Sequence, residues 1–276
     1  MKKFYDIIYI GILMLLLAGC QDEGVFTPED NLPVNVVYQV EMTDASQSRS
    51  LGNGSEVDEL IVGMFNDGRL VTMLTFEDGN DGKKDGKFEN ITIPMMTNET
   101  YDLVFWAQGK GNDIYNIDRN DFDITIDYSQ YNGVSLSKTN GFDAFAGQQK
   151  NVSVNNPGKK NITLTRPFAQ LNVLATSMSG IEKVSFNVTN VYKTYNPYKN
   201  SKEDLQNQDF SILPDSEYKI QIEANTYYYL ATVYLLAPAE VALKGGIYKQ
   251  NEDKLKDLDV PQLPLEANSR TNLLFE

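Results

Sequence analysis

The chain has 276 residues, a formal net charge of −14, one cysteine and no histidine. Without histidine, Ser-His-Asp triads, Cys-His pairs and His-based zinc sites are excluded, and the scattered acids disfavour nucleic acid, whose binders need clustered Lys and Arg. A glycosidase with paired carboxylates stays open as a class, but 38 acidic residues single out no pair, so we predict a non-enzyme without metal or cofactor.

The first twenty residues have the layout of a secretory signal peptide. Lys2 and Lys3 precede an apolar run over residues 7–18, which is too short to span a bilayer well. The run ends in Leu17-Ala18-Gly19-Cys20, which resembles the lipobox of bacterial lipoproteins. We therefore predict a signal peptide over residues 1–19 and lipid, palmitate included, on Cys20. A buried N-terminal helix is the alternative, but it does not require this tetrapeptide.

Residues 20–31 are polar and acidic and predict a flexible, lipidated tether. Gln21-Asp22-Glu23 resembles the acidic signal that directs some lipoproteins to the outer face of the cell. An outer-membrane lipoprotein displayed at the cell surface is the expectation.

After the tether, apolar and polar residues alternate with a period of two, which is typical of half-buried strands. The first such face consists of Val34, Val36, Tyr38 and Val40. Similar faces recur along the chain, and turn dipeptides such as Asn-Gly and Asp-Gly separate them. Short strands with frequent turns predict an all-β fold of β-sandwich type.

The most linker-like run inside the body is NNPGKK at residues 155–160. We place the domain boundary there, with one β-sandwich over residues 32–157 and a second over residues 158–276. The run YYYLATVYLLA at residues 227–237 is apolar on both faces, so it predicts a central strand of the second domain.

Aromatic residues raise the alternative of a sugar-binding surface. Trp106 lies within a predicted strand, where packing in the core is the favoured interpretation. The segment with Tyr192, Tyr195 and Tyr198 is the best candidate for an exposed sugar platform, interpreted as a loop.

Several segments together resemble the fimbrillin family, the type V pilins and related surface lipoproteins of anaerobic Gram-negative bacteria. They keep their order along nearly the whole chain: SRSLGNG at 48–54, DELIVGMF at 58–65, YDLVFWAQ at 101–108, FDAF at 142–145, ITLTRPFAQLNV at 162–173 and NSRTNLL at 268–274. The resemblance implies two transthyretin-like β-sandwich domains and assembly into adhesive fimbriae without catalysis.

The family's maturation implies a protease cut after Arg49, so that the product begins at Ser50. The cut would release the strand carrying Val34 to Val40, which we expect to be an edge strand, and a partner strand would then occupy its place by β-augmentation. A position in the centre of a sheet, with partners on both sides, would exclude this mechanism. The candidate donor strand is Arg270, Thr271, Asn272, Leu273, Leu274 and Phe275.

The leading hypothesis is thus a fimbrial subunit or a fimbrial anchor lipoprotein that supports cell adhesion. Its expected partners are other fimbrial subunits (copies of itself or paralogues), the outer membrane through the lipid on Cys20, and host or bacterial surface ligands. If Arg49 is not cut, the protein stays anchored. The alternative is a surface glycan-binding lipoprotein of a nutrient-uptake system.

Overall fold

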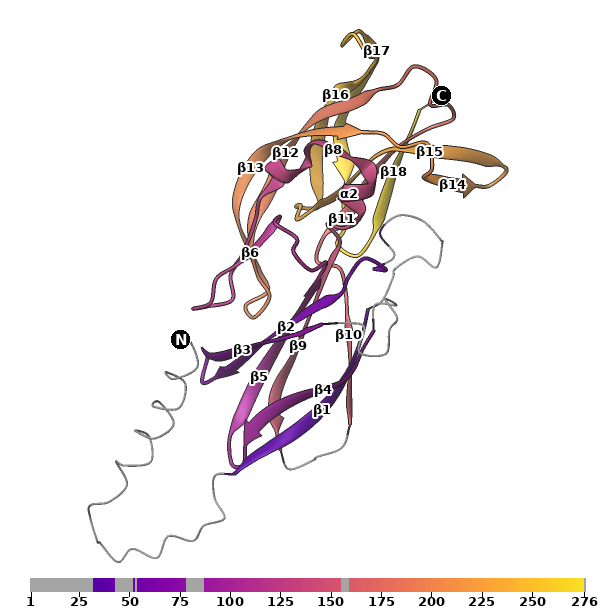
Figure 1. Ribbon diagram of the computed structural model, residues 1–276. Coiled ribbons are helices and arrows are strands. Elements are labelled where there is room, and N and C mark those ends of the chain that lie inside the picture. The colour runs from indigo at the N-terminus through magenta and orange to yellow at the C-terminus, as the bar shows by residue number, and fades with distance from the viewer. Residues whose placement is uncertain (1–31, 43–51, 53, 78–86, 155–158, 276) are drawn as a thin grey trace, which may run out of the picture. The chain divides into compact units, whose positions relative to one another are not determined.

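The structure, a computed structural model, describes residues 32–42, 52, 54–77, 87–154 and 159–275. These residues fold almost entirely into β-strands (Figure 1), which confirms the predicted all-β class. All strands belong to the second of two compact units of the chain, Pro33–Glu276. Within the described ranges, no helix combines the length and the apolar character needed to cross a membrane.

The first β-sandwich consists of a three-stranded sheet in the order β10-β1-β4 and a four-stranded sheet in the order β3-β2-β5-β9. Side chains from both sheets share one hydrophobic cluster, so the two sheets pack face to face. The strands are β1 (Pro33–Met42), β2 (Glu59–Asn66), β3 (Arg69–Glu77), β4 (Lys87–Met96), β5 (Thr100–Gln108), β9 (Ala144–Ser153) and β10 (Lys160–Leu164).

The second β-sandwich consists of a sheet in the order β14-β15-β11-β18 and a larger sheet with the path β17-β16-β12-β13-β8, to which β6 and β7 are attached. Its core belongs to a second hydrophobic cluster, which also includes side chains of β2, β5 and β9. The elements are β6 (Tyr115–Ile117), β7 (Ile124–Ile126), η1 (Tyr128–Tyr131), β8 (Asn132–Ser135), α2 (Leu136–Asn140), β11 (Ala169–Ala175), β12 (Lys183–Asn196), β13 (Ser201–Leu213), β14 (Lys219–Ile222), β15 (Asn225–Leu235), β16 (Glu240–Tyr248), β17 (Lys254–Pro264) and β18 (Arg270–Phe275).

Strand pairing crosses the domain boundary predicted at residues 157 and 158 in both directions. Strand β10 follows that boundary, yet it pairs with β1 of the first β-sandwich. Strands β7 and β8 precede it, yet they pair with β12 and β13 of the second. The Pro- and Gly-containing run indicates a break between two strands, but composition does not tell which sheet each strand joins. The domain limits stay a prediction.

Strand β1 differs from the prediction in its position. We expected an edge strand, and this is wrong: β1 is the middle strand of its sheet, antiparallel to β4 and parallel to β10. Tyr38, for example, lies opposite Ile91 on one side and Lys160 on the other. The alternation of apolar residues determines which face of a strand is buried, but it does not determine how many neighbours the strand has.

Strand β15 confirms the prediction of a central strand. It lies between β14 and β11, and its residues from Tyr229 to Leu235 are all buried. Where β14 has ended, two tyrosine hydroxyls take the place of a neighbouring strand. Tyr131 accepts a hydrogen bond from the backbone N–H of Tyr234 (3.0 Å), and Tyr128 accepts one from Leu236 (3.0 Å). We call these two contacts the tyrosine caps, since they satisfy backbone donors that would otherwise be buried without partners.

The two capping tyrosines predict alkaline unfolding. Burial raises the pKa of Tyr128 and Tyr131 above the ordinary value of about 10, outweighing the accepted backbone hydrogen bonds, which lower it. Below about pH 10 both phenols are protonated in the folded and unfolded chain, so their contribution to stability is complete. As the pH rises further, the unfolded chain loses these protons first, and each tyrosine lowers the free energy of unfolding by about 1.4 kcal/mol per pH unit.

This loss is measured by urea unfolding at a series of pH values, with tyrosinate absorbance as a second signal. The Tyr131→Phe variant lacks one titrating group and should lose stability less steeply. A free energy of unfolding that stays constant well above pH 10 would contradict the prediction.

Candidate assembly surfaces

Cys20, Arg49 and Ser50, the predicted sites of lipidation and cleavage, lie outside the described residues. Lipid attachment and maturation therefore stay predictions from the sequence. The other two predicted elements, strand β1 and strand β18, are described in full.

The inward face of β1 contains the predicted residues. Val36, Tyr38 and Val40 are completely buried, and Val34 packs against the same hydrophobic cluster at its rim. The ring of Tyr38 lies 5.5 Å from that of Phe105 in the opposite sheet. The prediction that these four side chains share one apolar face is confirmed.

The hydroxyl of Tyr38 adds a polar contact inside this apolar surrounding. It donates a hydrogen bond to Gln149 Oε1 in strand β9 (2.9 Å), which links the two sheets of the first β-sandwich. Burial raises the pKa of Tyr38 above its ordinary value, so the phenol is neutral at physiological pH.

Strand β1 is also held by main-chain pairing on both sides. Its pairing with β4 runs from Pro33 to Glu41, and its pairing with β10 runs from Tyr38 to Met42. Removing β1 would break both ladders and expose its three completely buried side chains, whose burial is worth about 5–9 kcal/mol in total. That value is comparable to the whole stability of a typical domain, about 5–15 kcal/mol.

Strand β18, the predicted donor strand, already has a place in its own sheet. It pairs in parallel with β11 over six residues without a register shift, from Arg270 to Phe275. Two side-chain contacts fix this register: Asn172 Nδ2 donates to Asn272 Oδ1 (2.8 Å), and Arg270 Nε donates to Gln170 Oε1 (2.9 Å). Among the described strands it is the outermost one of its sheet, and Leu274 is 46% exposed.

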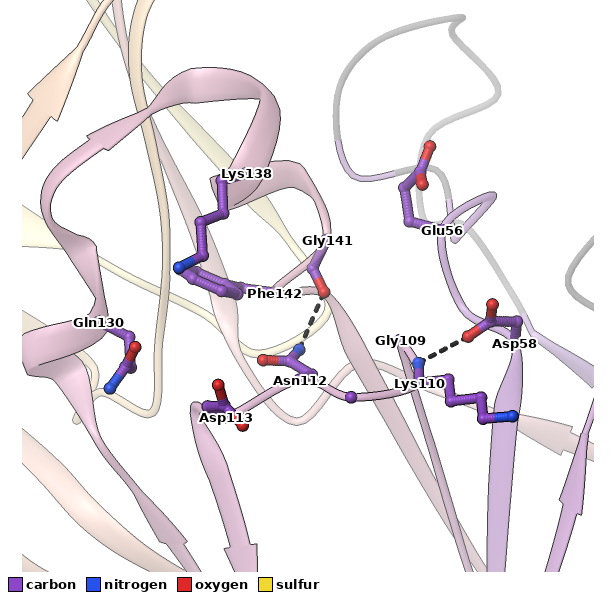
Figure 2. A pocket seen from close by; sticks show the side chains of 11 residues that line it. Glu56, Asp58, Gly109, Lys110, Asn112, Asp113, Gln130, Lys138, Gly141 and Phe142 are labelled. Atoms are coloured by element: carbon purple, nitrogen blue, oxygen red, sulfur yellow. Dashed lines mark hydrogen bonds between the residues drawn. The ribbon is translucent and has the colours of Figure 1, made fainter.

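A polar cavity of about 300 Å³ lies beside the turn Gly109–Gly111 (Figure 2). Two lysines and three acidic residues line it, but Lys110 is paired with Glu77 (2.7 Å). Lys138 lies over the ring of Phe142 (5.9 Å), and this ring is only 4% exposed. The cavity offers hydrogen-bonding groups without an open aromatic face, so it lacks the platform on which sugar rings stack.

The predicted sugar platform is only partly a loop. Strand β12 continues to Asn196 and includes Tyr192 and Tyr195, and Tyr198 follows in a turn. Tyr195 is 7% exposed, and the ring of Tyr198 stacks on Phe65 at 4.1 Å with an interplanar angle of 3°. Trp106 is completely buried, as predicted, and donates a hydrogen bond to Gln108 (2.8 Å). The rings of Tyr195 and Trp106 are thus covered by protein, and Phe65 covers one face of Tyr198, while Tyr192 and Tyr198 are half-buried.

A buried ion pair went unrecognised in the sequence. Arg166 Nε and Nη2 donate to the two carboxylate oxygens of Asp143 at 2.6 and 2.7 Å, and these side chains are 0% and 1% exposed. The one signal was an arginine between the apolar residues Leu164 and Phe168. In the part of the chain that the structure describes, no group of three or more acidic or cysteine side chains is arranged to hold a metal ion.

One protein family and several solved structures are similar to this chain. A family described as "Family of unknown function (DUF6562)" matches residues 27–274. A crystal structure described as a candidate adhesin from Bacteroides thetaiotaomicron has 12% identity and a TM-score of 0.51, with 84% of this chain and 81% of that chain covered. The fimbrial anchor protein Mfa2 from Porphyromonas gingivalis has 15% identity and a TM-score of 0.47, with 83% of each chain covered.

A candidate polysaccharide-binding protein from Bacteroides thetaiotaomicron has 13% identity and a TM-score of 0.48, with 81% of this chain and 80% of that chain covered. No curated protein matches the chain in sequence. The match with a TM-score of 0.51 shows a shared fold. The predicted likeness to fimbrillin-like surface proteins is therefore confirmed at the level of the fold.

Proposed function

The chain belongs to a family of unknown function, DUF6562, and we propose that this member is a non-enzymatic adhesin or fimbrial component of the cell surface. The observation that carries the proposal is the fold of two β-sandwiches shared with the candidate adhesin. The lipobox-like segment ending in Cys20 and the ordered fimbrillin-like segments support the same role. Lipid on Cys20 then holds the protein at the outer membrane, where it contacts other fimbrial subunits and surface ligands.

The position of β1 distinguishes an anchored fimbrial component from a subunit that polymerises. The strand-exchange mechanism that we derived from the sequence required β1 to be a removable edge strand. In the structure it is a middle strand with three completely buried side chains. We therefore propose an anchored component that retains β1, in the manner of a fimbrial anchor, instead of a subunit that polymerises after losing this strand.

The outer edge of β18 is then the surface at which a partner contributes a strand. Among residues 271–275 there is no charge and no proline, the two features by which edge strands commonly avoid pairing. Main-chain hydrogen bonds to an added strand would supply the affinity, as in other cases of β-augmentation.

Retention of β1 is tested by incubating the full chain, purified in detergent, with an arginine-specific protease. The exposed Arg69 and Arg119 are replaced by lysine, so that cleavage at either of them is excluded. We expect the fragment that ends at Arg49 to stay bound, because β1 remains paired on both sides and buried. The cut protein should keep the native mass of the uncut chain.

The control is the Arg49→Lys variant in the same background, which should stay whole. Loss of the N-terminal fragment with formation of SDS-resistant ladders would contradict the anchored form and favour a polymerising subunit. Tight retention of the intact protein on polysaccharide would instead favour the glycan-binding alternative.

A further inference from the structure

The main chain of Gly52 is held by side chains from three distant parts of the sequence. Its N–H donates to Asn140 Oδ1 (2.8 Å) at the end of α2. Its carbonyl oxygen accepts hydrogen bonds from Arg166 Nη2 (2.6 Å) and from Arg270 Nη2 (3.0 Å). The N–H group of Gly52 and both lone pairs of its carbonyl oxygen thus form hydrogen bonds.

The groups that surround Gly52 are fixed by contacts of their own. Arg166 forms the bidentate ion pair with Asp143, and its guanidinium lies 4.8 Å from the centre of the Phe145 ring. Arg270 is oriented by Gln170. Arg166 is buried and Arg270 is half-buried. Because both donors are held in place by these contacts, little side-chain freedom remains to be lost when they bind a carbonyl group.

The site accepts only glycine at this position. The φ of Gly52 is +75°, in the left-handed region that favours glycine. A Cβ atom here would lie 2.6 Å from Gln170 Oε1 and 2.6 Å from the Tyr234 hydroxyl. Both the backbone conformation and the surrounding space therefore select a residue without a side chain.

We propose that Asn140, Arg166 and Arg270, with Asp143 orienting Arg166, form a binding site for the main-chain N–H and carbonyl of one residue, with Gly52 as its internal ligand. We call this set the Gly52 clamp. Arg270 is the first residue of β18, so the clamp couples Gly52 to the C-terminal strand. Strand β18 is held in register as long as Gly52 is bound, whether or not the chain is cut at Arg49. This inference does not depend on the adhesive role.

Hydrogen exchange on the full chain tests the coupling. In the Gly52→Ala variant, the amides of β18 should exchange about tenfold to a hundredfold faster, the loss expected when a hydrogen bond from a charged donor is removed. Arg270→Gln alone should give a similar acceleration. Combining the two changes should give less than the sum of their separate effects, because both break the hydrogen bond between Arg270 and Gly52, although Arg270→Gln also removes the contact with Gln170. Unchanged exchange in β18 of the Gly52→Ala variant, or full additivity, would overturn the proposal.

Gly111 provides a matched control. Its φ is +71°, and a Cβ atom there would meet nothing within 4 Å, so Gly111→Ala introduces the same backbone strain away from the clamp. Exchange in β18 should stay at the wild-type rate in this variant, and an equal acceleration would overturn the coupling. If Gly52→Ala does not fold, Asn140→Ala removes one contact to Gly52 without backbone strain and should still accelerate exchange in β18. No acceleration would contradict the clamp.

Discussion

Replacing Asp143 with alanine is expected to lower the free energy of unfolding by about 3–5 kcal/mol. The change leaves the guanidinium of Arg166 in a completely buried position without its carboxylate partner. Removing one member of a buried ion pair costs more than the pair contributes, because the remaining charge has lost its water and gained no compensation. Urea unfolding at neutral pH measures the effect.

The matched control removes both charges. In the Asp143→Leu, Arg166→Met double variant no isolated charge remains, so most of the lost stability should return. The exposed pair of Lys110 and Glu77 provides a second comparison, and Glu77→Ala should change stability little. If Asp143→Ala is as mild as Glu77→Ala, the buried pair is not formed in solution.

Replacing Tyr38 with alanine is expected to lower the free energy of unfolding by about 3–5 kcal/mol. The ring is completely buried in the middle strand of the three-stranded sheet and packs against Phe105. Its removal leaves a cavity between the two sheets of the first β-sandwich. In chain cut after Arg49, the same change should weaken retention of the N-terminal fragment, which size-exclusion chromatography detects.

Two further variants separate the causes of this loss. Tyr38→Phe keeps the ring and removes the hydrogen bond to Gln149, so it should cost only about 1 kcal/mol. Val71 lies on the edge strand β3 and is 54% exposed, so Val71→Ala should have little effect. Equal effects of Tyr38→Ala and Val71→Ala would mean that β1 is not packed as described.

Much of the fold could be predicted because the burial of a strand is visible as a pattern of apolar and polar residues within that strand. The alternation of Val36, Tyr38 and Val40 indicated the buried face of β1, and the doubly apolar run of β15 indicated its central place. These features depend only on the residues of one strand. The lone tryptophan could be assigned to the core for the same reason.

The neighbours of each strand could not be predicted in this way. Strand β10 completes the sheet around β1 from far along the chain, and nothing in the local pattern of β1 records it. Likewise, the sequence contains Asp143 and Arg166 without any sign that they are paired. We interpreted Tyr195 and Tyr198 as exposed, because their burial depends on Trp106 and Phe65, which belong to other strands.

The tyrosine caps have a consequence for how the sheet of β14, β15, β11 and β18 can grow. At one edge of this sheet lie the four-residue strand β14 and the hydroxyls of Tyr128 and Tyr131. They leave few main-chain N–H and C=O groups with which an added strand could pair. Within the described residues, the opposite flank ends in the regular strand β18. A partner strand is therefore expected to pair at the β18 edge alone. Copies assembled through this sheet would all be added in the same orientation, so the two ends of the assembly would differ.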